Sequence, residues 1–369
     1  MKSFNLSILT LAFFLFVSVQ SQATVWTVSN VTSRPAQFTQ LQAAIDSALI
    51  NDTILMTGGG ALYSTATLRK PMVIIGEGIG PQTTPARISQ LNLYRLNSSL
   101  AADGSKIYGL RINNLYIDGN FTGASVGQET INNIIIERCQ IETTRYQSSD
   151  GGFNNLTFRN CLFKDIDGSG QTRAEFFEVS EFSAVLYTNC VFSNSIFWTW
   201  YVWVSVNSGI IIRNCLFMNT TTSIFQGGSG RTIQQLIVEN SIFYKAEPTG
   251  TNNSTFNNNI TYLNNSNTIP YGSNLGSGNI INIDPKFSNY PQLGAGHAWS
   301  YNFNLLAGSP AIGTGTNGTD IGLTGGNAPI NSNLHQVPKI PVVTEVNIPV
   351  SSVPVGGTLQ INIKANTRN

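Results

Sequence analysis

The chain has 369 residues, of which only 11% are charged, and its formal net charge at pH 7 is +1. With so small a net charge, the chain lacks the excess of positive charge that attracts nucleic acid and the excess of negative charge that attracts cations. A nucleic-acid partner is therefore not expected. Charged residues usually make up about a quarter of a globular domain. Here 34 glycines and many asparagines indicate a chain that is rich in turns.

The N-terminus has the pattern of a secretory signal peptide. Lys2 precedes the apolar run LSILTLAFFLFVSV (6–19), and small residues follow in Ser21-Gln22-Ala23. We expect cleavage after Ala23, within a signal peptide spanning residues 1–23, and a mature chain that is secreted, periplasmic or held at the cell surface. The apolar run is shorter than the ~20 residues that span a bilayer, so no transmembrane segment is expected in the mature chain.

Residues 24–80 are expected to cap one end of the molecule. The segments TVWTVSN (24–30) and LRKPMVIIGEG (68–78) predict strands. Between them, apolar residues recur at three- and four-residue spacing, which predicts a helix with one apolar face: Phe38, Leu41, Ala44, Ile45 and Ala48. Asn51-Asp52-Thr53 should end this helix and begin a strand. Because a stack of strands exposes an apolar end, we expect the helix to cover it.

The middle of the chain repeats one short pattern. Five segments carry it: IIIERCQI (134–141), LTFRNCLF (156–163), VLYTNCVF (185–192), IIIRNCLF (210–217) and LIVENSIF (236–243). Each segment alternates apolar and polar residues, turns at a small polar corner and alternates again, which predicts strand, bend, strand. Cys139 to Cys161 is 22 residues and Cys161 to Cys190 is 29. A unit this short is one turn of a stack, not a domain.

One asparagine marks the corner of four successive units. These residues are Asn160, Asn189, Asn214 and Asn240. In a stack they would lie about 4.8 Å apart, so each side-chain amide could donate to the next and form an asparagine ladder. Asparagine also tolerates the left-handed backbone that such a corner needs.

A cysteine follows the corner in four of the five units. The cysteines are Cys139, Cys161, Cys190 and Cys215, and Ser241 takes the fifth position. Zinc ligands commonly pair two to four residues apart, so the long spacings here argue against a zinc site. We expect a column of free, buried thiols that face the interior. Extending the pattern to LRINNLYI (110–117) places Leu115 in the cysteine position of the preceding turn.

These features together resemble the right-handed parallel β-helix family, the pectate-lyase-like solenoids. The opening is similar to the helix, Gly-Asp-Thr-Ile and strand of many secreted β-helix proteins, with Asn51 in the glycine position. The segments NIINIDPKFSNY (279–290) and TDIGLTGG (319–326) resemble the last turns of Bacteroidetes β-helix proteins. We therefore expect an all-β, right-handed, single-stranded parallel β-helix over residues 24–328, with a short N-terminal capping helix and a C-terminal hairpin tail.

The resemblance implies a catalytic site in the acidic loop FKDIDGSGQTRAEFFEVSEF (163–182). Lyases of this family abstract a proton beside a uronate with a lysine or arginine, often next to calcium held by carboxylates. The candidate catalytic residues are Arg173, Glu175 and Glu178, and the candidate calcium ligands are Asp165 and Asp167. In the alternative interpretation the aspartates are turn residues, the glutamates line a solvated strand face, and no cofactor is required.

A second candidate site is aromatic and lies in the next loop, IFWTWYVWVSV (196–206). Exposed flat rings bind glycans by stacking on sugar faces. The candidate carbohydrate-binding residues are Trp198, Trp200, Tyr201 and Trp203. The alternative is that neighbouring loops bury both faces of this segment, in which case the rings only pack.

The composition changes after residue 328, where Pro329 begins a proline-punctuated stretch (329–369). It ends in two strand-like runs, TEVNIPV (344–350) and TLQINIKA (358–365), which predict a linker and a short β-hairpin. Such a hairpin is too small to be an independent domain. It is expected to lie along the solenoid or to contact a protein partner.

Three functions remain open at this point. The preferred interpretation is a secreted β-helix protein that binds extracellular or cell-surface polysaccharide. The first alternative is a polysaccharide lyase that acts on a uronate-containing glycan through Arg173. The second is a structural, adhesin-like surface protein with a partner at its C-terminal tail. The asparagine and cysteine columns are interior features, so any site should lie in the segments that differ between turns.

Overall fold

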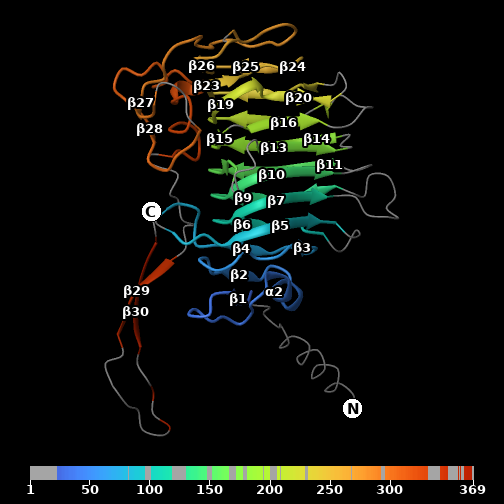
Figure 1. The fold of residues 1–369 in the computed structure, drawn as a ribbon, viewed down its shortest axis with the longest axis vertical. Coiled ribbons are helices and arrows are strands. Elements are labelled where there is room, and N and C mark those ends of the chain that lie inside the picture. The colour runs from blue at the N-terminus through green and yellow to red at the C-terminus, as the bar shows by residue number, and fades with distance from the viewer. Residues whose placement is uncertain are drawn as a thin grey trace, which may run out of the picture.

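The structure, a computed structural model, is an elongated stack of parallel strands whose first turn lies next to the helix α2 (Leu41–Ser47) (Figure 1). The residues described are 23–81, 83–95, 101–118, 130–147, 152–165, 172–177, 181–193, 195–199, 206–207, 209–228, 232–266, 268–291, 296–330, 341–347, 356, 358 and 361–367. The predicted signal peptide (1–23) therefore lies almost wholly outside them.

The stack has two long walls. Sheet A consists of β1 (Val25–Val28), β2 (Thr53–Met56), β4 (Val73–Ile75), β6 (Lys106–Tyr108), β8 (Ile131–Asn132), β9 (Ile135–Glu137), β11 (Gly152–Arg159), β14 (Glu181–Thr188), β18 (Ile210–Arg213), β22 (Ile237–Glu239) and β25 (Thr255–Asn257). Sheet B consists of β3 (Ala66–Leu68), β5 (Arg87–Tyr94), β7 (Arg111–Asp118), β10 (Gln140–Gln147), β12 (Leu162–Phe163), β13 (Thr172–Phe177), β15 (Val191–Ser193), β16 (Ser195–Thr199), β19 (Leu216–Ser223), β20 (Phe225–Gly227), β23 (Ile242–Glu247) and β26 (Ile260–Tyr262).

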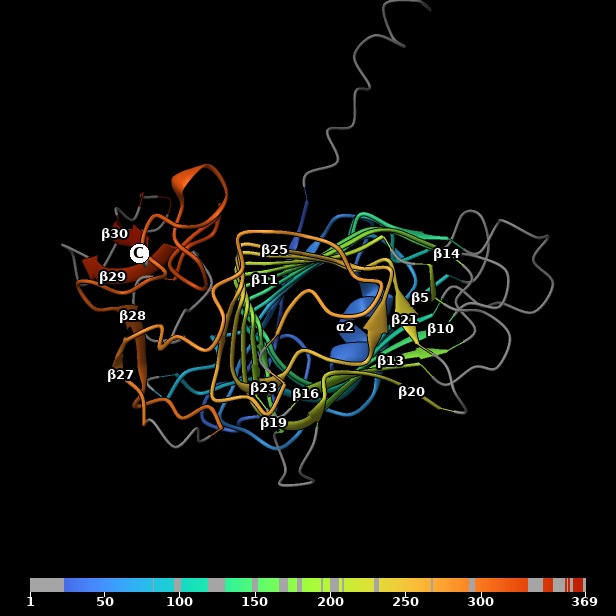
Figure 2. The same ribbon diagram turned by 90° about the horizontal axis from the view of Figure 1, so that it is seen from above.

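Three smaller sheets complete the described part of the chain. The parallel strands β17 (Val206–Asn207), β21 (Ile233–Gln234) and β24 (Thr251–Asn252) form a third wall, sheet C. The pairs β27 (Phe287–Asn289) with β28 (Asn302–Leu305), and β29 (Pro341–Asn347) with β30 (Asn362–Thr367), are antiparallel. Both pairs lie to one side of the stack (Figure 2).

Each wall is built from strands that come from successive turns of the chain. The order β9, β11, β14, β18 and β22 in sheet A skips the strands that lie in sheet B, and every pairing along it is parallel. Viewed from above, the walls enclose one continuous interior (Figure 2). The predicted all-β parallel solenoid, with a short N-terminal helix and a C-terminal hairpin, is confirmed.

The corners between sheets A and B have the expected left-handed backbone. The φ angles of Asn160, Asn189, Asn214 and Asn240 lie between 51° and 54°. Their backbone N–H groups donate to the next turn, as in the bond from Asn189 N to Arg213 O at 3.1 Å. Asparagine enters this conformation more readily than most residues, which explains its recurrence at the corner.

One predicted position is wrong. Cys139 has Leu110 beside it in the preceding turn, since Gln140 pairs with Arg111, and Leu115 lies five residues further along β7. The corner of that turn is Gly109, with a φ of 63°. Glycine adopts this conformation at little steric cost, so the turn needs no asparagine. Its corner therefore cannot be recognised by comparison with the asparagine corners of the later turns.

The interior contains two stacked columns. Cys139, Cys161, Cys190 and Cys215 are fully buried and free, as expected. Burial raises the pKa of the first three of these thiols well above the usual value, which makes them inert as nucleophiles. Beside them, four phenyl rings stack with centroids 4.6, 4.6 and 4.9 Å apart: Phe163, Phe192, Phe217 and Phe243.

The N-terminal cap is held together by one carboxylate. Asp52 accepts hydrogen bonds from the backbone N–H of Thr24 and of Leu49, both at 2.7 Å, and from Trp26 Nε1 at 2.9 Å. The preceding Asn51 has a φ of 67°, which explains why the resemblance places a glycine there. Burial alone would raise the pKa of the Asp52 carboxyl, but the three donors lower that pKa below its usual value.

This arrangement predicts an acid-sensitive cap. Replacing Asp52→Asn should lower the free energy of unfolding at pH 7 by about 1–2 kcal/mol, because the neutral amide accepts these bonds less well. A carboxyl with a lowered pKa stabilises the fold above its unfolded value of about 4, and this stability is lost as the pH falls through the folded value. Urea unfolding at pH 7 and pH 3 should show the two proteins converging at the lower pH. An equal difference at both pH values would contradict this.

The described part of the chain contains no helix that is long and apolar enough to span a membrane. The hairpin predicted at the C-terminus is present, with Val343 opposite Ala365 and Asn347 opposite Asn362. Its strands begin three residues before and four residues after the predicted runs.

Candidate functional site

The structure brings three of the predicted site residues together on the outer face of sheet B. Arg173 and Glu175 lie on β13, and Trp198 lies on β16, where it pairs directly with Glu175. These residues were expected to lie in loops, but Thr172–Phe177 and Ser195–Thr199 are strands of sheet B. The alternation that the sequence shows is therefore a sheet alternation, with Ala174 and Phe197 buried in the interior.

Two neighbouring strands extend this row. Arg145 on β10 pairs with Glu175, and Tyr116 on β7 pairs with Arg145. Tyr116, Arg145, Glu175 and Trp198 thus occupy one register position on four adjacent strands, and Arg173 lies two residues before Glu175. We refer to these five residues as the Arg–aromatic patch.

Charge and ring contacts connect the whole patch. Arg145 Nη2 lies 3.2 Å from Glu175 Oε2, and Arg173 Nη1 lies 3.8 Å from Glu175 Oε1. The Arg145 guanidinium lies over the Tyr116 ring at 4.8 Å from its centroid, and that of Arg173 lies over the Trp198 ring at 5.7 Å. Each cation is therefore held by a ring on one side and by a carboxylate on the other.

The exposed group of the patch is cationic. The side chains of Arg145 and Arg173 are 33% and 40% exposed, whereas that of Glu175 is 7% exposed. Two guanidinium groups and one carboxylate leave a net charge of +1 within the patch. Two exposed guanidinium groups suit the binding of an anion, because each can donate several hydrogen bonds to it.

Of the remaining candidate catalytic, calcium and carbohydrate residues, only Asp165 belongs to the described part of the chain. Asp165 is half-buried. Within the described ranges, no group of three or more histidine, cysteine, aspartate or glutamate side chains could hold a metal ion. The other candidates lie outside the described residues: Asp167, Glu178, Trp200, Tyr201 and Trp203.

Sequence reasoning missed Tyr116 and Arg145. Arg145 could have been found from its sequence separation from Glu175, which is 30 residues and so close to the longest repeat spacing of 29. The repeat was aligned on its corner, however, and the loops between turns vary in length. Residues that follow the corner by different intervals cannot be assigned to one row before the strand register is known.

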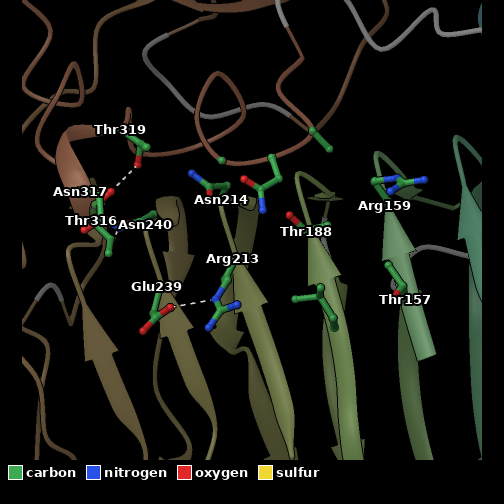
Figure 3. A pocket seen from close by; sticks show the side chains of 14 residues that line it. Thr157, Arg159, Thr188, Arg213, Asn214, Glu239, Asn240, Thr316, Asn317 and Thr319 are labelled. Atoms are coloured by element: carbon green, nitrogen blue, oxygen red, sulfur yellow. Dashed lines mark hydrogen bonds and ion pairs between the residues drawn. The ribbon is translucent and has the colours of Figure 1, made fainter. Parts of the chain in front are cut away.

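A groove of about 540 Å³ lies against the outer face of sheet A (Figure 3). The asparagine corners separate this wall from sheet B, which carries the Arg–aromatic patch. The floor of the groove consists of Arg159, Thr188, Arg213 and Glu239, which are register partners on β11, β14, β18 and β22. Its wall is formed by residues 316–328, which we call the C-terminal strap.

The corner asparagines hold this strap. Asn189 Nδ2 donates to the carbonyl oxygens of Leu323 at 3.0 Å and Gly325 at 2.8 Å. Asn214 Nδ2 donates to two further strap carbonyls, at 3.1 and 3.3 Å, and Asn240 Oδ1 accepts from the backbone N–H of Thr316 at 2.9 Å. Apart from the bond that Asn189 Oδ1 accepts from Thr188 Oγ1, these side-chain bonds run to the strap, whereas the sequence predicted bonds from one asparagine to the next.

Glycines in the strap allow this close approach. A Cβ atom on Gly325 would lie 2.6 Å from Asn214 Nδ2, and one on Gly326, whose φ is 73°, would lie 2.5 Å from Asn214 Oδ1. Neither distance is compatible with a side chain. The Gly325-Gly326 pair is therefore what lets the strap reach the corner.

Comparison with known proteins adds no family assignment. No family model matches the chain, and no curated protein matches it.

Proposed function

We propose that the protein binds an acidic, carboxylate-bearing polysaccharide along the Arg–aromatic patch. The observation that carries the proposal is the single row of Tyr116, Arg145, Glu175 and Trp198 across four adjacent strands, with Arg173 over the tryptophan ring. Rings and guanidinium groups in one line suit a repeating, linear ligand.

The spacing of the row supports this ligand class. Neighbouring strands lie about 4.8 Å apart, which is comparable to the length of one hexose unit in an extended polysaccharide. A chain laid across the strands would therefore pass the exposed guanidinium groups of Arg145 and Arg173, which lie over the rings of Tyr116 and Trp198. Guanidinium groups pair with carboxylates in a bidentate manner, and the rings hold them in position.

Secretion would place such a protein where extracellular polysaccharides occur. The signal peptide predicted for residues 1–23 supplies that expectation. The lyase alternative is less well supported, because a guanidinium group only donates hydrogen bonds and stays protonated in proteins. A base that removes a proton from a uronate would have to lose its own proton first.

Retention on immobilised alginate, polygalacturonate and chondroitin tests the proposal. Arg173→Ala should weaken binding about ten- to a hundredfold, which corresponds to the loss of one charge-assisted contact of about 1.5–3 kcal/mol. Trp198→Ala should weaken it by a similar factor. Arg173→Lys, which keeps the charge and loses the planar fork, should fall between wild type and Arg173→Ala.

Arg34→Ala is the matched control, because this arginine is 49% exposed and pairs with Glu77 near the N-terminal cap. It removes the same charge far from the patch and should bind like the wild type. Unchanged retention of both Arg173→Ala and Trp198→Ala would overturn the proposal. Ultraviolet absorbance of unsaturated ends, followed with and without calcium on the same polymers, would reveal the lyase activity that the alternative requires.

A further inference from the structure

We propose that the groove between sheet A and the C-terminal strap is a second binding site, which takes a neutral sugar unit through vicinal hydroxyl groups. It lies on a different wall of the solenoid from the Arg–aromatic patch and does not depend on it. Three features of the groove support this site: the ion pairs on its floor, the donor and acceptor that Arg213 and Glu239 present side by side, and the hydrogen bonds that fix its wall.

Both guanidinium groups on the floor are already paired with carboxylates. Arg213 Nε lies 2.9 Å from Glu239 Oε2, and Arg159 forms an ion pair with Glu137 on the neighbouring strand β9. Each guanidinium group in the groove therefore already faces a carboxylate. A charged ligand would have to compete with these pairs, whereas an uncharged ligand can add hydrogen bonds to both partners without separating them.

The Arg213–Glu239 pair matches the chemistry of a sugar. A guanidinium group only donates hydrogen bonds, and a carboxylate only accepts them. Adjacent hydroxyl groups on a pyranose ring can each do both, so one can accept from Arg213 while its neighbour donates to Glu239. The side chains are 46% and 22% exposed, so both remain accessible from the groove.

The rest of the lining completes an amphipathic pocket. Thr188 lies between Arg159 and Arg213 on the floor, as Figure 3 shows, and offers a hydroxyl group. Leu186 and Ala328 contribute the apolar contacts that the C–H face of a sugar requires. The volume of about 540 Å³ lies within the usual range of small-molecule pockets and leaves room for a short oligosaccharide.

The site is formed before any ligand arrives. Asn214 alone provides two hydrogen bonds from the corner to the wall, and Asn189 provides two more. Because the strap is already fixed to the corner, a ligand does not have to order it on binding. Binding therefore loses less conformational entropy, which favours affinity.

Isothermal titration with neutral oligosaccharides (cellohexaose, xylohexaose, mannohexaose and maltohexaose) tests the inference. At least one should bind the full-length mature protein. Glu239→Gln keeps the shape of the side chain and should lower that affinity about tenfold or more, because a charged acceptor is lost. Asn214→Gly keeps the left-handed corner and removes only the amide that holds the wall. It should also lower the affinity, since the groove is then no longer fixed.

Trp198→Ala separates this site from the Arg–aromatic patch and should leave the neutral oligosaccharide affinity unchanged. Thermal melts show whether each variant is folded, and Glu239→Gln should melt like the wild type because its side chain lies at the surface. The inference is overturned if none of the four sugars binds at millimolar concentration. It is also overturned if Glu239→Gln and Asn214→Gly bind as well as the wild type, or if oligouronates displace the neutral sugar competitively.

Discussion

Replacing Phe192 with alanine should lower the free energy of unfolding by about 3–5 kcal/mol. The ring is 1% exposed and stacks between Phe163 and Phe217, with both centroid distances at 4.6 Å. Its removal leaves a gap in the middle of a column that is held by hydrogen-bonded strands on either side. Since those strands fix the spacing between turns, the neighbouring rings cannot move together to fill the gap.

Equilibrium unfolding in guanidinium chloride measures this loss. Phe192→Leu retains most of the apolar volume and should cost clearly less than the alanine variant, which separates the cavity from the loss of ring stacking. A cost below about 1 kcal/mol for Phe192→Ala would show that the walls of the solenoid collapse onto the gap. That result would contradict the rigid column described above.

Asn189→Ala should destabilise the protein by about 3–5 kcal/mol, through two separate effects. The amide is fully buried and donates to the carbonyl oxygens of Leu323 and Gly325, so its loss leaves two acceptors without this donor. The backbone also has a φ of 51°, a conformation that costs an alanine roughly 1–2 kcal/mol.

Two further variants separate these effects. Asn189→Gly removes the amide but accepts the left-handed corner, so it should cost about 1–2 kcal/mol less than the alanine variant. Asn155→Ala changes a residue with a φ of 56° whose exposed side chain makes one surface hydrogen bond, to Asn133 Oδ1, so little besides the backbone cost should remain. Equal losses for Asn189→Ala and Asn155→Ala in denaturant titrations would mean that the strap contributes nothing to stability.

The architecture could be predicted because it is repeated. Alternation, a corner and a second alternation recur in every unit, and the asparagines mark where the backbone must adopt a positive φ. The prediction failed one turn earlier, where Gly109 replaces asparagine at the corner and Leu115 was assigned in place of Leu110. Glycine meets the same backbone requirement without resembling the repeat, so the pattern could not be extended by matching letters.

The candidate site was predicted only in part. Arg173, Glu175 and Trp198 were selected as chemically suited residues, but they were assigned to two separate loops. What joins them is the pairing of β13 with β16, and this register depends on loops of unequal length. Tyr116 and Arg145 enter the patch by the same pairing, and nothing in their local sequence distinguishes them from other strand residues.

The strap could not be predicted at all. Asn189 and Gly325 are separated by 136 residues, and no periodic pattern connects them. The corner amides were expected to bond along their own column, which is the nearest arrangement that the repeat suggests. The hydrogen bonds instead run to carbonyl groups of the strap, a segment that has little regular structure of its own.

The strap also changes how the solenoid can come apart. In a stack whose turns contact only their neighbours, the end can fray one turn at a time. Here Asn189, Asn214 and Asn240 belong to three successive turns and hold one continuous segment. The last of these turns cannot peel away without first releasing a chain that is still anchored to the two below it. We therefore expect these turns to unfold together as one cooperative block, which the strap closes only once its three turns have stacked.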